Sequence, residues 1–264
     1  MDEQATQEPV VPAVDVLPAV AAAPAPEAAA APAAYPFSVL RVLSTALRIT
    51  KANFTAFLVV AFVLEAPGLL IQLALGAEGG GAALSGLLGL FTRALTTSVV
   101  VYGVIMELHG SRPSTKACIA EGFRHMGRVL GVSIVTTFAI GLAMLLLIVP
   151  GVIVALMYFV VVPVTVVEKL GIDAAMKRSS ELTRGRKGDL FLIAALGFGV
   201  MFSAALFATA SFGREGAIPF TYVATVFSTM FFSVVTAVAY VELRNIREGT
   251  KVPELATAFA RIRK

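Results

Sequence analysis

The stretch from Val129 to Val167 contains no charged residue, and it constrains the fold more than any other feature of the sequence. A single α-helix over these 39 residues would be roughly 58 Å long, about twice the thickness of the hydrocarbon core of a membrane. The chain must therefore fold back, and Pro150-Gly151 is the strong helix breaker near the middle of the stretch. We expect one membrane-crossing helix over 129–149 and a second over 151–167.

Further pairs of apolar stretches lie on both sides of this one. Together they give the expected spans 52–77, 82–106, 129–149, 151–167, 190–213 and 216–241. Gly79-Gly80-Gly81 is the expected turn of the first pair, and Arg214-Glu215 is that of the last. A charged fraction of 14% and a mean hydropathy of +0.86 fit a chain solvated largely by lipid. Because the runs are continuous rather than alternating, a transmembrane β-barrel is excluded. The sequence predicts an all-α polytopic membrane protein with six transmembrane helices in three hairpins.

The basic residues are distributed unevenly between the two sides of these hairpins. Nineteen of the 21 Lys and Arg residues lie before the first span, after the second, after the fourth and after the sixth. The positive-inside rule then places these segments and both termini in the cytoplasm, and we expect the bacterial cytoplasmic (inner) membrane as the location. Because the cations lie between apolar runs, they indicate the phospholipid bilayer and its anionic headgroups as partners rather than nucleic acid.

The first 36 residues form a segment of different composition. They are rich in Pro and Ala, and they contain five acidic residues and no Lys or Arg. Such a segment cannot bury a core, so we expect residues 1–36 to be a disordered cytoplasmic tail and residues 37–264 to be the membrane domain. Cys118 is the single cysteine, which excludes an intramolecular disulfide.

The basic segments share a pattern that suggests an internal repeat. Apolar residues at spacings of three and four predict cytoplasmic amphipathic interfacial helices over 37–49, 114–128, 172–183 and 253–262. The apolar stripes expected in the first two are Leu40, Leu43 and Leu47, and Ile119, Phe123, Met126 and Leu130. One interfacial helix and one hairpin would make a unit of about 60–80 residues.

Glu65 and Arg93 are the charged residues inside the predicted spans, at similar depths of the first hairpin. A charge at that depth is unfavourable unless it is paired, so we expect an intramembrane pair. The pair is either a structural salt bridge that locks the hairpin or a substrate or proton site. Pro67-Gly68 supports the second interpretation, because it permits a kink beside Glu65.

Each returning helix ends in a glutamate: Glu107, Glu168 and Glu242. A carboxylate is unfavourable at the C-terminus of a helix because of the macrodipole. We therefore expect these glutamates to bind nearby Lys and Arg side chains and to pin the interfacial helices. A joint site for a lipid headgroup or a cation is the alternative.

The densest basic stretch offers contacts for phosphate. Its candidate headgroup contacts are Lys177, Arg178, Arg184, Arg186 and Lys187. Cations with neighbouring hydroxyl groups suit an anionic lipid headgroup. The ordinary positive-inside topology accounts for the same charges equally well.

Residues 150–192 carry a pattern of small and charged residues between apolar runs. It begins with Pro150-Gly151, continues through Pro163, Val167-Glu168 and Arg178-Ser179, and ends with Leu182-Thr183-Arg184-Gly185. This pattern resembles the membrane domain of glycerophosphoryl diester phosphodiesterase and its stand-alone relatives, over most of 37–250. One departure is Ser180, where relatives often have an aromatic residue. The resemblance implies a membrane architecture and an association with phospholipid metabolism, whereas phosphodiesterase chemistry belongs to a separate soluble barrel.

The sequence shows no motif for catalysis, and His109, His125 and Cys118 have no partners at triad or metal-ligand spacing. We therefore expect no catalytic, cofactor-binding or metal-binding residues, and no enzyme activity. The first hypothesis is a non-enzymatic membrane protein that contacts anionic phospholipid in an envelope or lipid-related role. The alternative is a small transporter or channel that uses the hairpin repeats and the Glu65–Arg93 pair.

Overall fold

The computed structural model describes residues 37–76, 79–108 and 115–248, which lie within one compact unit of the chain, 34–264. The predicted tail over 1–36 and the predicted interfacial helix over 253–262 lie outside the described residues. Within the described ranges the secondary structure consists of helices, with no strand. The helices are α1 (Val39–Ala52), α2 (Phe54–Leu75), α3 (Gly79–Leu108), α4 (Thr115–Leu146), α5 (Ile148–Met157), α6 (Val161–Glu168), α7 (Ile172–Thr183), α8 (Lys187–Gly216) and α9 (Ile218–Glu248).

Within the described residues, six helical segments are long and apolar enough to cross a membrane. They are α2, α3, α4, α8, α9 and the segment Ile148–Glu168, which combines α5 and α6. The predicted all-α polytopic class is confirmed, and the chain is a multi-pass integral membrane protein. Large apolar side chains cover the outer faces of these helices, as expected for lipid-facing surfaces.

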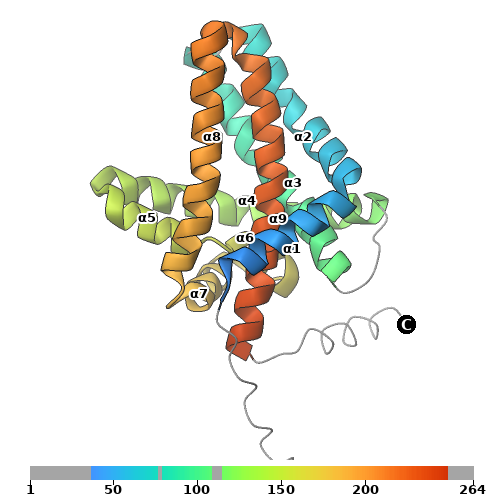
Figure 1. Cartoon of the computed structure of the whole chain (residues 1–264), viewed down its shortest axis with the longest axis vertical. Coiled ribbons are helices and arrows are strands. Elements are labelled where there is room, and N and C mark those ends of the chain that lie inside the picture. The colour runs from blue at the N-terminus through green and yellow to red at the C-terminus, as the bar shows by residue number, and fades with distance from the viewer. Residues whose placement is uncertain (1–36, 77–78, 109–114, 249–264) are drawn as a thin grey trace, which may run out of the picture. The chain divides into compact units, whose positions relative to one another are not determined.

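Consecutive helices pack as pairs, α2 against α3, α4 against α5 and α8 against α9. Helix α9 is central, because it also contacts α1, α2, α3, α6 and α7. Figure 1 shows α8 and α9 running side by side up the view, whereas the α4–α5 pair projects to the left. The α4–α5 pair is therefore not parallel to the α8–α9 pair.

The turn between α4 and α5 lies at Leu147, three residues before the predicted position at Pro150-Gly151. Proline lacks an N–H group, and the first turn of a helix is where that group would have no partner in any case. Pro150 therefore lies in the first turn of α5 instead of between the helices. Gly151 permits the close contact, because a Cβ there would lie 2.8 Å from the Cα of Met144.

The first hairpin also turns earlier than predicted. Helix α2 ends at Leu75, and Gly76 follows with a φ of +83°, which glycine adopts without a steric penalty. Gly79-Gly80-Gly81 does not form the turn but begins α3. In the third pair, Gly213 has a φ of +68° just before Arg214-Glu215, close to the predicted turn.

Three of the predicted amphipathic helices lie within the described part of the chain, and they agree with the structure to different degrees. Helix α7 covers Ile172–Thr183, as predicted. The second segment is not a separate helix, because it continues without a break into the span as α4. Helix α1 forms, with Ser38 accepting a hydrogen bond from the Arg41 N–H as its N-cap.

The apolar stripes of α1 and α4 were predicted to face the membrane interface, and other residues form the faces buried against the protein. On α1 the buried residues are Val42, Ala46, Ile49 and Thr50, whereas Leu40 is 79% exposed. On α4 the buried residues include Cys118, Gly122, His125, Val129 and Val132, whereas Phe123 is exposed. Small residues let helix backbones approach closely. Large apolar side chains can face lipid without a free-energy cost, because acyl chains are as apolar as the protein interior.

Candidate functional site

Glu65 lies in the middle of α2 with 7% of its surface exposed, and it lines a cavity of about 320 Å³ between α2, α3 and α9. Thr92 of α3 donates a hydrogen bond of 3.1 Å to Oε2 of Glu65. The other carboxylate oxygen, Oε1, has no hydrogen-bond partner in the described part of the chain. The other polar side chains that line the cavity are Gln72, Ser85, Arg93, Thr221, Tyr222 and Thr225.

Arg93 shares this cavity with Glu65, but the expected ion pair is not formed. Between the described residues, no ion pair of 4.0 Å or less joins the two side chains, and the Arg93 Nε donates instead to Thr229 Oγ1 of α9 at 3.3 Å. Consecutive residues of a helix point roughly 100° apart. Because Thr92 faces Glu65, its neighbour Arg93 is directed away from it, and the Arg93 side chain is exposed.

A second polar cavity, of about 210 Å³, begins at Arg93 and extends toward α6. Its polar lining residues are Arg93, Thr97, Ser228, Thr229, Ser233 and Thr236. The hydroxyl oxygens of Ser233 on α9 and Thr97 on α3 lie 3.1 Å apart. Hydroxyl side chains thus follow the contact between α3 and α9 on both sides of Arg93.

Sequence reasoning missed these hydroxyl residues because it considered only the charges inside the spans. A signal was present, since Thr221, Thr225, Thr229 and Ser233 recur every four residues along α9. Residues four apart lie on one face of a helix. A stripe of hydroxyl groups in an otherwise apolar span therefore indicates a polar face turned toward the protein interior.

Glu168, at the end of α6, joins three helices. It accepts hydrogen bonds from Arg178 of α7 at 3.2 and 3.3 Å, and from the Tyr240 hydroxyl of α9 at 2.9 Å. Arg178 also pairs with Glu248 of α9. Burial opposes the charge on Arg178, but the bonds to Glu248 and Glu168 outweigh it and raise the pKa of Arg178 above its ordinary value. The guanidinium therefore stays charged and holds α7 against α9.

The other two glutamates differ from each other, and the prediction that Glu242 ends a helix is wrong, because α9 continues to Glu248. Glu242 of α9 accepts a hydrogen bond of 2.7 Å from Arg41 of α1. Glu107 is half-buried at the end of α3 and forms no ion pair with another described residue. The structure therefore brings two of the three carboxylates, Glu168 and Glu242, into contact with an arginine of an amphipathic helix.

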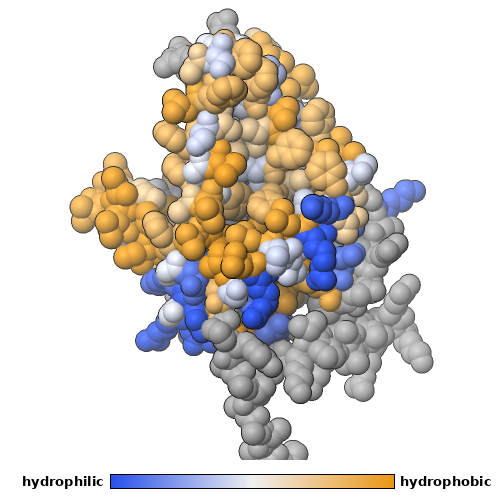
Figure 2. All heavy atoms as spheres, in the orientation of Figure 1, coloured by the Kyte–Doolittle hydropathy of each residue, from blue (hydrophilic) through white to orange (hydrophobic). Residues whose placement is uncertain are grey.

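The five candidate headgroup contacts do not share one environment. Arg178 is engaged by Glu168 and Glu248, and Arg186 lies 3.9 Å from Asp189. Those that form no ion pair with another residue in the described ranges are Lys177, Arg184 and Lys187. Figure 2 shows hydrophilic residues gathered around α7 and α1, next to the apolar surface of the longer helices.

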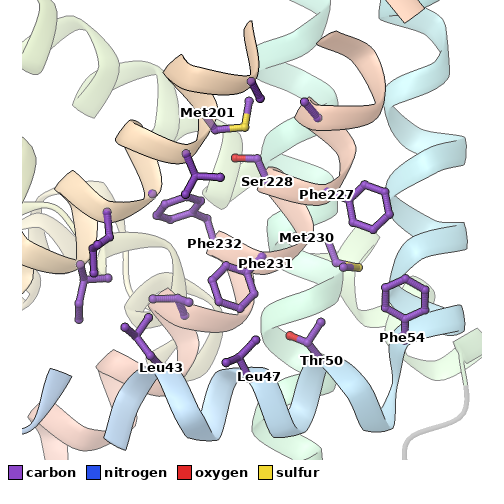
Figure 3. A pocket seen from close by; sticks show the side chains of 17 residues that line it. Leu43, Leu47, Thr50, Phe54, Met201, Phe227, Ser228, Met230, Phe231 and Phe232 are labelled. Atoms are coloured by element: carbon purple, nitrogen blue, oxygen red, sulfur yellow. The ribbon is translucent and has the colours of Figure 1, made fainter. Parts of the chain in front are cut away.

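An apolar cavity of about 530 Å³ lies between α1, α8 and α9 (Figure 3). Leu43, Leu47 and Thr50 of α1 border it on one side, and Phe231 and Phe232 of α9 border it on another. Thr50 is 8% exposed, and its hydroxyl has no hydrogen-bond partner among the described side chains and backbone. An almost wholly apolar lining suits hydrocarbon rather than a polar solute.

The described part of the chain has six apolar helices, a polar cavity among three of them, and basic amphipathic helices near one end. These features define a multi-pass integral membrane protein. Comparisons with protein-family models, with curated proteins and with solved structures found no match for this chain. Over the residues that the structure describes, no group of three or more His, Cys, Asp or Glu side chains is placed to hold a metal ion.

Proposed function

We propose that this chain is a non-enzymatic protein of the bacterial cytoplasmic membrane that binds anionic phospholipid through α7 and the start of α8, in an envelope or lipid-related role. One observation carries the proposal. Arg178 fixes α7 to Glu168 and Glu248, while Lys177, Arg184 and Lys187 have no carboxylate partner among the described residues. A helix fixed in this way presents its remaining cations at defined positions, which favours a phosphate over a diffuse counterion.

The apolar cavity supports the same proposal. Ile193 of α8 lines this cavity and follows Lys187 by six residues. A rise of 1.5 Å per residue separates the two residues by roughly 9 Å along the helix. A phospholipid with its phosphate at Lys187 would therefore have an acyl chain within reach of the cavity.

The proposal also covers the orientation of the protein in the membrane and its family. The uneven distribution of Lys and Arg supports cytoplasmic positions for α1, α7 and both termini. The motif from Pro150 to Leu192 supports membership of the family of glycerophosphoryl diester phosphodiesterase membrane domains, which would accord with an association with phospholipid.

Native mass spectrometry of the full-length protein in nanodiscs of phosphatidylglycerol or phosphatidylcholine tests lipid binding. A variant with Lys177→Gln, Arg184→Gln and Lys187→Gln should lose retained phosphatidylglycerol, because each cation near the membrane surface contributes about 1 kcal/mol. The matched control carries Lys116→Gln, Arg124→Gln and Arg128→Gln, which remove three charges from α4. Equal retention of phosphatidylglycerol by the α7–α8 variant and the unmodified protein would contradict the proposal.

A second candidate function, passage of a small solute, is favoured by a different observation. Arg93 lines both cavities, so polar lining side chains extend along α3 from Ser85 to Thr97 and along α9 from Thr221 to Thr236. Polar groups inside a membrane protein commonly mark a solute or ion pathway. Uptake of labelled solute into proteoliposomes that contain the protein, compared with protein-free liposomes, measures this function directly.

A further inference from the structure

The cavity around Glu65 and Arg93 has no role in lipid binding by α7. Glu65 is almost fully buried, and one oxygen of its carboxyl group has no partner in the described part of the chain. Burying an ionisable group without complete hydrogen bonding is costly, particularly in a membrane. Such a group is expected where a ligand supplies the missing partner.

Three of the four hydroxyl groups in this cavity are committed as donors, and one of them, Ser85 Oγ, also accepts a hydrogen bond of 3.5 Å from Gln72 Nε2. Each donates its proton to a backbone carbonyl: Tyr222 to Phe62 at 2.6 Å, Ser85 to Ala82 at 3.1 Å and Thr221 to Ala217 at 3.0 Å. Their oxygen atoms remain able to accept hydrogen bonds. Together with the carboxylate of Glu65, which lines the cavity, these oxygens offer hydrogen-bond acceptors to a ligand, which suits an ammonium group.

Arg93 supplies the opposite chemistry to the same cavity. A guanidinium has five N–H donors and no acceptor, and among the described residues Arg93 uses its Nε alone, as a donor to Thr229. Its side chain is exposed within an apolar span, where a charge without an anionic partner is unfavourable. The remaining donors suit a carboxylate or a phosphate.

We propose that this cavity binds a small zwitterion, with its ammonium group on Glu65 and its anionic group on Arg93. The volume of about 320 Å³ lies at the lower end of the range for ligand pockets and fits a metabolite rather than a peptide. A metal ion is a poorer match, because Glu65 is the one carboxylate that lines the cavity within the described residues. The inference rests on the second candidate function, whose cavity it uses, and is independent of lipid binding by α7.

Isothermal titration calorimetry on the full-length protein in phosphatidylglycerol nanodiscs tests the proposal. The probes are β-alanine, γ-aminobutyrate and O-phosphoethanolamine, and the single-charge controls are propylammonium, propionate and inorganic phosphate. We expect at least one zwitterion to bind about tenfold more tightly than every single-charge control, because each lacks one of the two charge contacts. Absence of binding by all three zwitterions, or equal binding of propylammonium, overturns the proposal; the latter indicates a cation site only.

Variants locate the binding. Glu65→Gln and Arg93→Gln should each lower the affinity for the zwitterion by about tenfold or more. Lys177→Gln, an exposed change on α7, should leave this affinity unchanged. Equal affinity in all three variants overturns the assignment to this cavity.

A second readout does not depend on variants that remove a charge. Thr225 lines the cavity, and Cys118 is the single cysteine. In a Thr225→Cys, Cys118→Ala protein, a bound zwitterion should slow modification by a methanethiosulfonate reagent several-fold. An unchanged rate at saturating zwitterion overturns the proposal. Zwitterion binding without uptake into proteoliposomes would reject the transport function while leaving the binding site in place.

Discussion

Arg41 Nη1 of α1 lies 2.7 Å from Glu242 Oε1 of α9, and this ion pair joins residues 201 positions apart. Glu168 and Arg178 make the corresponding contact between α6 and α7. In both places an arginine of an amphipathic helix meets a carboxylate at or near the end of a membrane-spanning segment. At Glu168, the last residue of α6, the contact also satisfies a charge that the helix macrodipole would otherwise disfavour.

The Arg41–Glu242 pair is partly exposed, with side-chain exposures of 50% and 20%. We therefore expect a small coupling energy of about 0.5 kcal/mol between Arg41→Gln and Glu242→Gln, as for other exposed pairs. Thermal unfolding in detergent of both single variants and the double variant measures it. Arg48→Gln, an exposed change on the same helix, should not couple to Glu242→Gln; coupling of similar size there would argue against a specific pair.

Glu168 should contribute more to stability than the Arg41–Glu242 pair, because it accepts hydrogen bonds from both Arg178 and Tyr240. Glu168→Gln is expected to lower the free energy of unfolding by about 2 kcal/mol, since it leaves a half-buried arginine without one of its carboxylates. Tyr240→Phe removes the hydrogen bond to Glu168 and the one that Tyr240 accepts from Arg244, and it should cost about 1 kcal/mol. Chemical denaturation in mixed micelles measures both values, and the reverse order would contradict this account of the network.

Gly122 of α4 faces α3 so closely that a Cβ there would lie 2.3 Å from a methyl group of Val99 and 3.2 Å from its backbone. Gly122→Ala should therefore separate α3 from α4 and lower stability by about 1–3 kcal/mol. Gly127, five residues later on the same helix, has open space around it. Gly127→Ala should be neutral or stabilise by about 0.5–1 kcal/mol, because alanine favours the helix. Melting temperatures that fall equally for both variants would indicate that the contact is not close.

The turn between α4 and α5 is apolar and exposed, with Leu145 at 84%, Leu147 at 67% and Ile148 at 73%. Because this hairpin is not parallel to α8 and α9 (Figure 1), we expect its tip to be embedded among acyl chains rather than to reach water. In a Cys118→Ala background, Leu147→Cys should react with a membrane-impermeant maleimide only after detergent is added.

Gly80→Cys is the control for that experiment, since Gly80 is exposed with open space at the start of α3. On the predicted topology it should be labelled in intact spheroplasts. Labelling of Leu147→Cys at the rate of Gly80→Cys would show that the α4–α5 turn reaches the outer surface.

The membrane class of the fold could be predicted because lipid solvation demands long runs without charge, which the sequence displays directly. The limits of α7 were also predictable, since Gly171 and Arg184 border an amphipathic run. The buried faces of α1 and α4 were not predictable by the same rule. The stripe with Leu40 and Leu47 was expected to face the membrane interface, so the side of α1 that packs against the protein, with Val42, Ala46 and Ile49, depends on neighbouring helices that the pattern does not specify.

The candidate site was predictable only in part. Glu65 and Arg93 are conspicuous as charges inside apolar spans, and they do line one cavity. Their partners were not predicted, because one residue along a helix changes direction by roughly 100°, and Thr92 rather than Arg93 faces Glu65. The hydroxyl groups of α9 carry no charge and were overlooked for that reason.

The central position of α9 has a consequence for how the protein is made. Helix α9 is the last described element to leave the ribosome, yet it contacts both members of the first hairpin and contributes Thr229, the hydrogen-bond partner of Arg93. Until α9 is inserted, the earlier helices can pack against one another, but the part of the core that α9 supplies is missing and Arg93 lacks Thr229 as a hydrogen-bond partner. Assembly of the bundle is therefore completed after synthesis of α9, and a nascent chain that stops before Ile218 should be recognised by membrane proteases as unfinished.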